Sequence, residues 1–504
     1  MIRSWLARST ALVSCLFLAA CGSLASAQSQ LDELTVAMSS DLSSFDPATG
    51  NAGSDHVFLY PVYDTLIDFD PETTEPKPGL AESWEYTDDL TLELKLREGV
   101  TFHDGEEFNA EAVAENLNRS RAEGTNLVSE LASISDVVAT DDYTVEIRLS
   151  EPDSALPLIL SDRSGMMVSP KSLEDPESLG SNPVGTGPWK LVDWNRGSAV
   201  KYTKYDDYWN DDVDVTPNLT LRVFTDPKAR VDSLITNQVD LSYQVGASDA
   251  EGLALNEAIT VESSPSMRVR MVYLDLSDDL IADQQVREAL NIAIDRDQLA
   301  NVGFFGYAQP ASTYFPTTHW ASVEEESAYD YDPDRARELI SDAGAEGANV
   351  SILLPNDANT VRIAEILRYS FNDVGLNVEL KPRELVQSTT EYFDEHRDPA
   401  LLSAWTGRPD PAQTYAQLLA ESGYYNAGSV APPGLEDAVE ESNTHTDNED
   451  RAVSLKEAGR LDREFSTFVP LVFEDSIVAY ANHVQGYQPN LLGKPKFTTI
   501  HEVR

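Results

Sequence analysis

The stretch between residues 348 and 380 restricts the fold of this chain more than any other. An apolar strand is expected over 348–354, followed by a helix that Thr360 caps and that carries apolar residues along one face. Gly375 is expected to end that helix, after which 376–380 alternates apolar and polar residues as a second strand. A strand, a helix and a strand in this order form a β-α-β unit, which favours a parallel pair. The unit predicts an α/β fold.

Other segments mix strands and helices in the same way. Alternating apolar residues predict strands, and apolar residues at helical spacing between capping residues predict helices. The expected elements are strands at 90–97 and 145–149, a helix over 110–121 capped by Asn109, a helix over 286–304 whose Val286, Leu290, Ala293 and Ile294 face inward, and a helix that Asp332 and Pro333 open and Gly344 closes.

The charge of the chain excludes several classes of partner. Its 504 residues, enough for about two to four domains, include 36 Lys and Arg against 86 Asp and Glu, which gives a net charge of −50. Nucleic acid and anionic membrane surfaces are therefore not expected as partners. Only 11 of the basic residues are lysines. An acidic, lysine-poor surface stays hydrated at high salt, so we predict a halophilic, salt-rich medium; an acidic surface for a partner is the alternative.

Residues 1–27 have the pattern of an export signal. Arg3 and Arg8 precede the apolar run 11–20, which is too short for a permanent membrane helix. Two processing sites remain open: a lipobox that would acylate Cys21, and an A-x-A site ending at Ala27. Cys15 and Cys21 are the only cysteines, so the mature chain has no disulfide and no thiolate metal site. No later segment reaches the length of a membrane span, and the mature protein is expected to be soluble.

No motif for catalysis, a cofactor or a metal is present. The chain lacks the phosphate-loop, HExxH and GxSxG patterns. Its seven histidines are scattered without ligand spacing, and His103 is expected in a surface turn rather than at a metal. Among 86 acidic residues a pair of carboxylates occurs by chance, so no glycosidase-type pair is inferred. We expect neither an enzyme nor a cofactor.

A set of short blocks is distributed over nearly the whole mature chain. They are SSFDP at 43–47, YDTLI at 63–67, the long block 79–113, PVGTGPW at 183–189, YDDYW at 205–209, the block 286–311 and YDPDRARELISDAG at 331–344. Together they resemble the extracytoplasmic solute-binding proteins of family 5, the dipeptide-, oligopeptide- and nickel-binding components of ABC importers.

The resemblance implies a two-lobed periplasmic binding protein fold of the α/β class, with hinge-linked lobes and an extra inserted subdomain. The first lobe would comprise 28–68, 184–270 and 474–504, the inserted subdomain 69–183, and the second lobe 271–473. Such proteins close over a ligand by hinge motion. The resemblance also implies a periplasmic monomer that hands short peptides or related small solutes to a membrane permease driven by a cytoplasmic ATPase. Membrane contact would come only through the permease or a lipid anchor.

The most informative site segment is Trp405-Thr406-Gly407. In peptide binders of this family, an Asp after such a segment pairs with the α-ammonium of the peptide. Here Arg408 follows, and Asp410 lies two residues further on. Because a guanidinium binds carboxylates and repels ammonium groups, we expect Arg408 to hold a ligand carboxylate and Asp410 or a neighbour to hold any amine. The alternative is that Arg408 pairs with a nearby acid and Asp410 caps a helix.

Further candidates come from the same resemblance. Arg268 and Arg270 precede the strand where the chain crosses between lobes; they could attract an anionic ligand or form a salt bridge. Residues that could line the ligand site or belong to the core are Trp405, Phe45, Tyr425 and Asn426, and Arg163 could also point at the ligand. The ligand itself stays open among a short peptide, an acidic amino-acid conjugate, an opine, a sugar and a metal chelate. An exported hydrolase acting on peptides or sugars is the alternative function.

Overall fold

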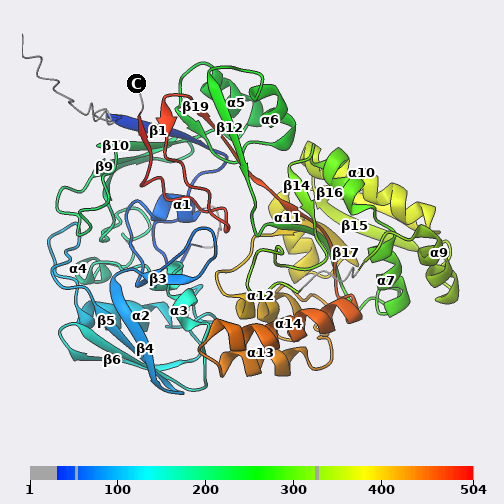
Figure 1. Cartoon of the computed structure of the whole chain (residues 1–504), viewed down its shortest axis with the longest axis horizontal. Coiled ribbons are helices and arrows are strands. Elements are labelled where there is room, and N and C mark those ends of the chain that lie inside the picture. The colour runs from blue at the N-terminus through cyan, green and yellow to red at the C-terminus, as the bar shows by residue number, and fades with distance from the viewer. Residues whose placement is uncertain (1–30, 51–54, 324–328, 503–504) are drawn as a thin grey trace, which may run out of the picture.

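The computed structural model describes residues 31–50, 55–323 and 329–502. The predicted signal segment with Cys21 and Ala27 lies outside the described residues. Three bodies are visible in Figure 1: two α/β lobes side by side, and a smaller body with a four-stranded sheet below the first of them. We call them the first lobe, the second lobe and the inserted subdomain.

The first lobe is built on a seven-stranded sheet in the order β12-β19-β11-β1-β10-β9-β8. Strand β1 is parallel to β10 and β11, and the other neighbours are antiparallel. The strands are β1 (Glu33–Met38), β8 (Trp189–Asn195), β9 (Ala199–Lys204), β10 (Asn218–Val223), β11 (Leu241–Ser242), β12 (Ile259–Ser264) and β19 (Ser476–Ala481), and the helices are α1 (His56–Leu59), α5 (Pro227–Ile235) and α6 (Ala247–Leu253).

The second lobe is built on a six-stranded mixed sheet in the order β14-β18-β13-β17-β15-β16. Its strands are β13 (Val269–Leu274), β14 (Ala308–Pro310), β15 (Asn349–Pro355), β16 (Asn377–Arg383), β17 (Ala400–Trp405) and β18 (Val469–Glu474). Its helices are α7 (Gln284–Ile292), α8 (Arg296–Gln298), α9 (Pro333–Asp342), α10 (Ala358–Asp373), α11 (Leu385–Thr389), α12 (Pro411–Leu419), α13 (Leu435–Asn443) and α14 (Asn448–Phe465), with π-helical turns at Leu299–Gly303 and Thr390–Asp394.

The inserted subdomain is an antiparallel sheet, β4-β5-β7-β6, against which α2 packs with Val113 and Leu117. Its elements are β4 (Ala81–Asp88), β5 (Thr91–Leu96), α2 (Ala110–Ser120), β6 (Ile134–Asp141), β7 (Thr144–Leu149), α3 (Leu156–Ile159), a 3₁₀ turn at Arg163–Gly165 and α4 (Pro170–Leu173). Two small hairpins complete the fold, β2 (Ile67–Phe69) with β3 (Pro76–Pro78) and β20 (Val484–Gln485) with β21 (His501–Glu502).

The predicted β-α-β unit is confirmed. Strands β15 and β16 pair in parallel, with Val350 opposite Val378, and α10 connects them. The predicted cap was wrong, because the Asp357 carboxylate accepts the backbone N–H of Thr360 at 2.9 Å. An aspartate one residue before the helix satisfies its free amides, so α10 begins at Ala358.

The helix predicted over 286–304 is interrupted. Helix α7 ends at Ile292, and Asp295 adopts an extended backbone. Its carboxylate accepts the N–H of Gln298 at 2.8 Å, so the chain begins a new helix there. The predicted inward face is nevertheless buried, as Val286 and Leu290 show.

Two smaller predictions also need correction, and two caps are confirmed. Leu90 is 41% exposed in the turn before β5 and does not belong to the strand. His103 lies in the predicted turn but is half-buried: its Nε2 donates to the Gly187 carbonyl at 2.8 Å, and burial lowers its pKa to about 4. Asn109 and Asp332 cap their helices as predicted.

The chain passes between the lobes at two adjacent places. Strand β12 ends at Ser264 opposite Ser476, and β13 begins at Val269 opposite Phe473. The two crossing segments therefore run antiparallel beside each other, one over 265–268 and the other over 474–475. The structure thus has two hinge-linked lobes, with the crossing strands visible between them in Figure 1.

Candidate functional site

A buried group of charged side chains gathers residues from the first lobe, the inserted subdomain, the second lobe and the C-terminal segment. We call it the junction cluster; it comprises His56, Glu130, Asp162, Arg163, Arg408 and Lys494. Because these side chains come from different bodies of the fold, the junction cluster forms only where those bodies meet.

The centre of the junction cluster is Asp162. Its carboxylate accepts the Nζ of Lys494 at 2.7 Å and also contacts the Nε2 of His56. Lys494 lies 3.3 Å from the same His56 nitrogen. Burial alone would raise the pKa of Asp162. The contacts with His56 and Lys494 outweigh this effect and hold the pKa well below the usual range. Burial lowers the pKa of His56 to about 4, so this imidazole is neutral at neutral pH.

Arg163 follows Asp162 and is held by a second acid. Its Nη2 lies 3.4 Å from Asp55, which is fully buried. The N–H of Ser43 also donates to Asp55, at 2.9 Å. The Arg163 guanidinium, a candidate for the ligand site, is therefore engaged in an ion pair within the protein.

Arg408 extends from the second lobe, in the loop directly after β17. Gly407 takes the left-handed backbone conformation with φ of 78°, which a glycine adopts without steric cost. The Arg408 guanidinium lies over the Trp405 ring at 4.7 Å and donates to the Gly407 carbonyl at 3.2 Å. Within the described part of the chain, no carboxylate lies within 4.0 Å of this guanidinium. Arg408 thus carries a half-buried charge without a counter-ion.

The Trp405 side chain supports this loop. It is 2% exposed, and Tyr425 packs edge-on against it with ring centroids 4.9 Å apart. Its indole Nε1 is buried and has no hydrogen-bond partner among the residues that the structure describes. Thr406 is half-buried in the same loop. The loop therefore presents the Arg408 guanidinium, with the buried N–H donor of Trp405 beneath it.

Glu130 of the inserted subdomain lies opposite this loop. Ser164 donates its hydroxyl to Glu130 at 3.0 Å. Burial raises the pKa of Glu130 and the charge of Asp162 raises it further, whereas the charge of Arg408 lowers it. Arg408 also lowers the pKa of Lys494, adding to the effect of burial. Arg408 is therefore electrostatically coupled to Glu130 and Lys494 but forms no direct ion pair with Glu130.

The structure places the other predicted residues elsewhere. Asp410 is fully buried, caps α12 by accepting the N–H of Ala412 at 2.9 Å, and binds Arg451 through both oxygens at 2.8 Å. These contacts match the helix-cap alternative and leave Asp410 no free oxygen for an amine. Asn426 is 2% exposed and donates to backbone carbonyls of its own loop, so it belongs to the loop framework.

Arg268 and Arg270 both bind Glu474, with Nε–O distances of 3.0 and 2.6 Å. This geometry matches the salt-bridge alternative. Phe45 is fully buried against Trp194 in the core of the first lobe, with ring centroids 5.2 Å apart. Among the described residues, neither the arginine pair nor Phe45 forms an ion pair or a ring contact with a member of the junction cluster.

Sequence reasoning did not single out His56, Glu130, Asp162 or Lys494. One signal was available for Lys494, since only 11 lysines occur in the chain and a buried one needs a partner. Asp162 was adjacent to the predicted Arg163. Glu130 carried no signal, because it is one of 86 acidic residues.

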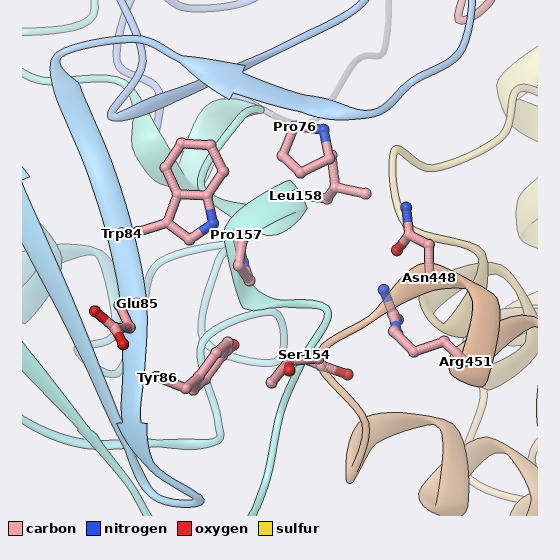
Figure 2. Close-up of a pocket in the computed structure, with 10 residues that line it drawn as sticks. Pro76, Trp84, Glu85, Tyr86, Ser154, Pro157, Leu158, Asn448 and Arg451 are labelled. Atoms are coloured by element: carbon pink, nitrogen blue, oxygen red, sulfur yellow. The ribbon is translucent and has the colours of Figure 1, made fainter.

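A separate groove lies between the inserted subdomain and the second lobe (Figure 2). This cavity has a volume of about 370 Å³; Trp84 of β4 and Pro157 of α3 form one wall, and Asn448 and Arg451 of α14 form the other. Next to it, Ser154 donates through its N–H to the Asn443 carbonyl at 3.3 Å and through its hydroxyl to the Ser442 carbonyl at 3.1 Å. These bonds attach the inserted subdomain to the end of α13.

Comparisons with known proteins follow this architecture. The model of the family described as bacterial extracellular solute-binding proteins, family 5 (middle), matches residues 75–426. The glutathione-binding protein GsiB of Escherichia coli O1:K1 / APEC is 29% identical over 472 residues, which cover 90% of this chain and 91% of GsiB. The periplasmic binding protein DppA of Helicobacter pylori, solved with the peptide STSA, is 25% identical with a TM-score of 0.83, covering 93% of this chain and 98% of DppA.

A third structure shows the shared fold alone. AgaA of A. tumefaciens R10, solved with agropinic acid, has a TM-score of 0.82 at 20% identity, covering 94% of this chain and 99% of AgaA. Helices long and apolar enough to cross a bilayer do not occur in the portion of the chain that the structure describes.

Proposed function

The chain belongs to the bacterial extracellular solute-binding proteins of family 5, and we propose that it captures a carboxylate-bearing short peptide or related small solute between its lobes. It serves as the solute-binding component of an ABC importer. It delivers the solute unchanged to a membrane permease, whose cytoplasmic ATPase supplies the energy.

One observation carries the choice of a carboxylate: Arg408 has no counter-ion among the described residues. A half-buried guanidinium without a partner favours an anionic ligand group, and the planar fork matches a carboxylate with two parallel hydrogen bonds. The buried indole N–H of Trp405, which has no partner within the described ranges, lies beneath it and offers a further donor. The ligands named for two of the relatives, glutathione and a peptide, carry carboxylates.

The location of the protein and the division of the chain complete the proposal. We assign residues 1–27 to an export signal, processed at Cys21 with a lipid tether or at Ala27 without one, and we place the mature monomer in the periplasm. The first lobe takes 28–68, 184–270 and 474–504, a division supported by β1, β8–β12 and β19 sharing one sheet. The inserted subdomain takes 69–183 and the second lobe 271–473. The acidic surface suits a salt-rich medium.

Two measurements test the ligand class. Mass spectrometry of the protein purified under native conditions identifies any solute that remains bound. Calorimetric titration with glutathione and with dipeptides then compares the wild type with Arg408→Gln. We expect the substitution to weaken binding about 10- to 100-fold, the range for a lost hydrogen bond between charged groups.

Arg196 provides a matched control for this substitution. It is also an arginine over a tryptophan ring, 3.9 Å from Trp194, but it is exposed and belongs to the first lobe. Arg196→Gln is expected to leave the affinity unchanged. Equal affinities of the wild type and Arg408→Gln would remove Arg408 from the site, and hydrolysis of the bound solute would contradict a carrier.

A further inference from the structure

The charges of the junction cluster are paired, with two exceptions. Asp162 is neutralised by Lys494, and Asp55 by Arg163. His56 is neutral because burial lowers its pKa. Glu130 and Arg408 remain: among the residues described, neither has an oppositely charged group within 4.0 Å.

These two side chains come from different bodies. Glu130 belongs to the inserted subdomain and is oriented by Ser164, whose hydroxyl donates to it at 3.0 Å. Arg408 belongs to the second lobe and is oriented by the Trp405 ring and the Gly407 carbonyl. Both side chains are half-buried, so water only partly compensates their charges.

We propose that Glu130 binds the ammonium group of a zwitterionic ligand whose carboxylate is held by Arg408. This proposal rests on the proposed function and names its substrate class: solutes with an amino-acid-like end, in which a free ammonium and a free carboxylate lie on the same carbon. A γ-glutamyl group and a free α-amino acid have such an end. An N-acylated acid lacks the ammonium.

The electrostatics favour an ammonium over other groups at Glu130. Burial and the nearby Asp162 both raise the pKa of Glu130, and the charges of Arg408 and Lys494 only partly offset this rise. The charge of Lys494 acts on Glu130 only from a distance, because its amino group donates to Asp162 at 2.7 Å and forms no ion pair with Glu130 among the described residues. A ligand ammonium would provide the missing charge and a hydrogen-bond donor together.

The arrangement also explains how such a ligand favours closure. A zwitterion whose carboxylate is bound by Arg408 and whose ammonium is bound by Glu130 bridges the second lobe and the inserted subdomain. A ligand shifts a conformational equilibrium only by its difference in affinity for the two states. The two contacts can form together only when both bodies are close, so this ligand stabilises the closed arrangement.

The test compares a free with a blocked amine in two variants. The probes are glutathione, whose γ-glutamyl end carries both charges, glutamate, and their N-acetylated derivatives. In the wild type, we expect N-acetylation to weaken calorimetric affinity about 10- to 100-fold, the range for a lost hydrogen bond between charged groups. In Glu130→Gln, the free-amine probes are expected to weaken by a similar factor, and N-acetylation is expected to have little further effect.

The controls separate recognition from folding and from the proposed function. Glu123→Gln removes an exposed acid of the same subdomain and is expected to change nothing. Glu130→Asp keeps the charge and is expected to retain the preference for a free amine, and thermal melting checks the folding of each variant. The inference is overturned if Glu130→Gln binds the free-amine probes like the wild type, or if the wild type prefers the acetylated probes. The latter result would leave Arg408 and the proposed function intact, whereas failure of every probe and of native ligand capture would overturn both.

Discussion

The ion pair between Asp410 and Arg451 allows the sharpest test of how the second lobe is held together. Both side chains are almost completely buried, at 0% and 2% exposure, and two hydrogen bonds of 2.8 Å join them. Asp410 also caps α12. Removing a cap costs about 1 kcal/mol, and leaving a buried partner without its counter-ion costs about 3 to 5 kcal/mol. We expect Asp410→Ala to lower the free energy of unfolding by about 4 to 6 kcal/mol.

Urea denaturation measures this change, because urea, unlike a salt, does not screen the remaining charges. Tryptophan fluorescence is a suitable signal, since the Arg451 guanidinium lies 5.4 Å from the Trp320 ring centre. The double variant Asp410→Asn/Arg451→Met is expected to recover most of the loss, because replacing both members of a buried pair can be nearly neutral. Ligand affinity of folded Asp410→Ala should stay close to that of the wild type. An unchanged unfolding free energy together with lost binding would show that Asp410 faces the ligand.

Three further predictions concern other parts of the molecule. Glu474→Gln leaves the buried Arg270 without its counter-ion, so we expect a loss of about 3 kcal/mol in urea unfolding and a changed radius of gyration in small-angle scattering. Burial lowers the pKa of His319 to about 3 from 6.5. Its stabilising contribution is therefore complete above pH 6.5 and is lost as the pH falls. Between pH 6.5 and 5 the loss of stability is about 2 kcal/mol, and His319→Gln should flatten this pH dependence in unfolding measurements. A Cβ added at Gly165 would lie 1.7 Å from the carbonyl oxygen of Leu160; Gly165→Ala should therefore destabilise the inserted subdomain by at least about 3 kcal/mol, seen as faster proteolysis, and wild-type resistance would contradict that packing.

Local patterns predicted the elements whose cause is local. The apolar spacing of 348–380 was sufficient for the β-α-β unit, because side-chain periodicity follows directly from backbone geometry. The break between α7 and α8 was missed because Asp295 lies within a continuous apolar pattern. The capping carboxylate of Asp295 starts a new helix despite that pattern. The spacing of apolar residues gives no sign of such a cap.

The site could be predicted only where a motif carried it. Arg408 became a candidate through its Trp-Thr-Gly neighbours, and the cap alternative for Asp410 came from its position before a helix. The contact between Lys494 and Asp162 joins residues 332 positions apart. Such a pair depends on the packing of whole bodies, and the sequence of one chain contains no local sign of it.

The adjacent crossing strands determine which motions the two lobes can make. β12 pairs with β19 up to Ser264 and Ser476, and β13 pairs with β18 from Val269 and Phe473. The connection is therefore a narrow ribbon of two antiparallel segments lying side by side. Such a ribbon can bend perpendicular to its flat face. Sliding one segment along the other would break the hydrogen bonds of the strand pairs on either side. We therefore expect the lobes to rotate about a single axis, so that the same two faces meet at each closure.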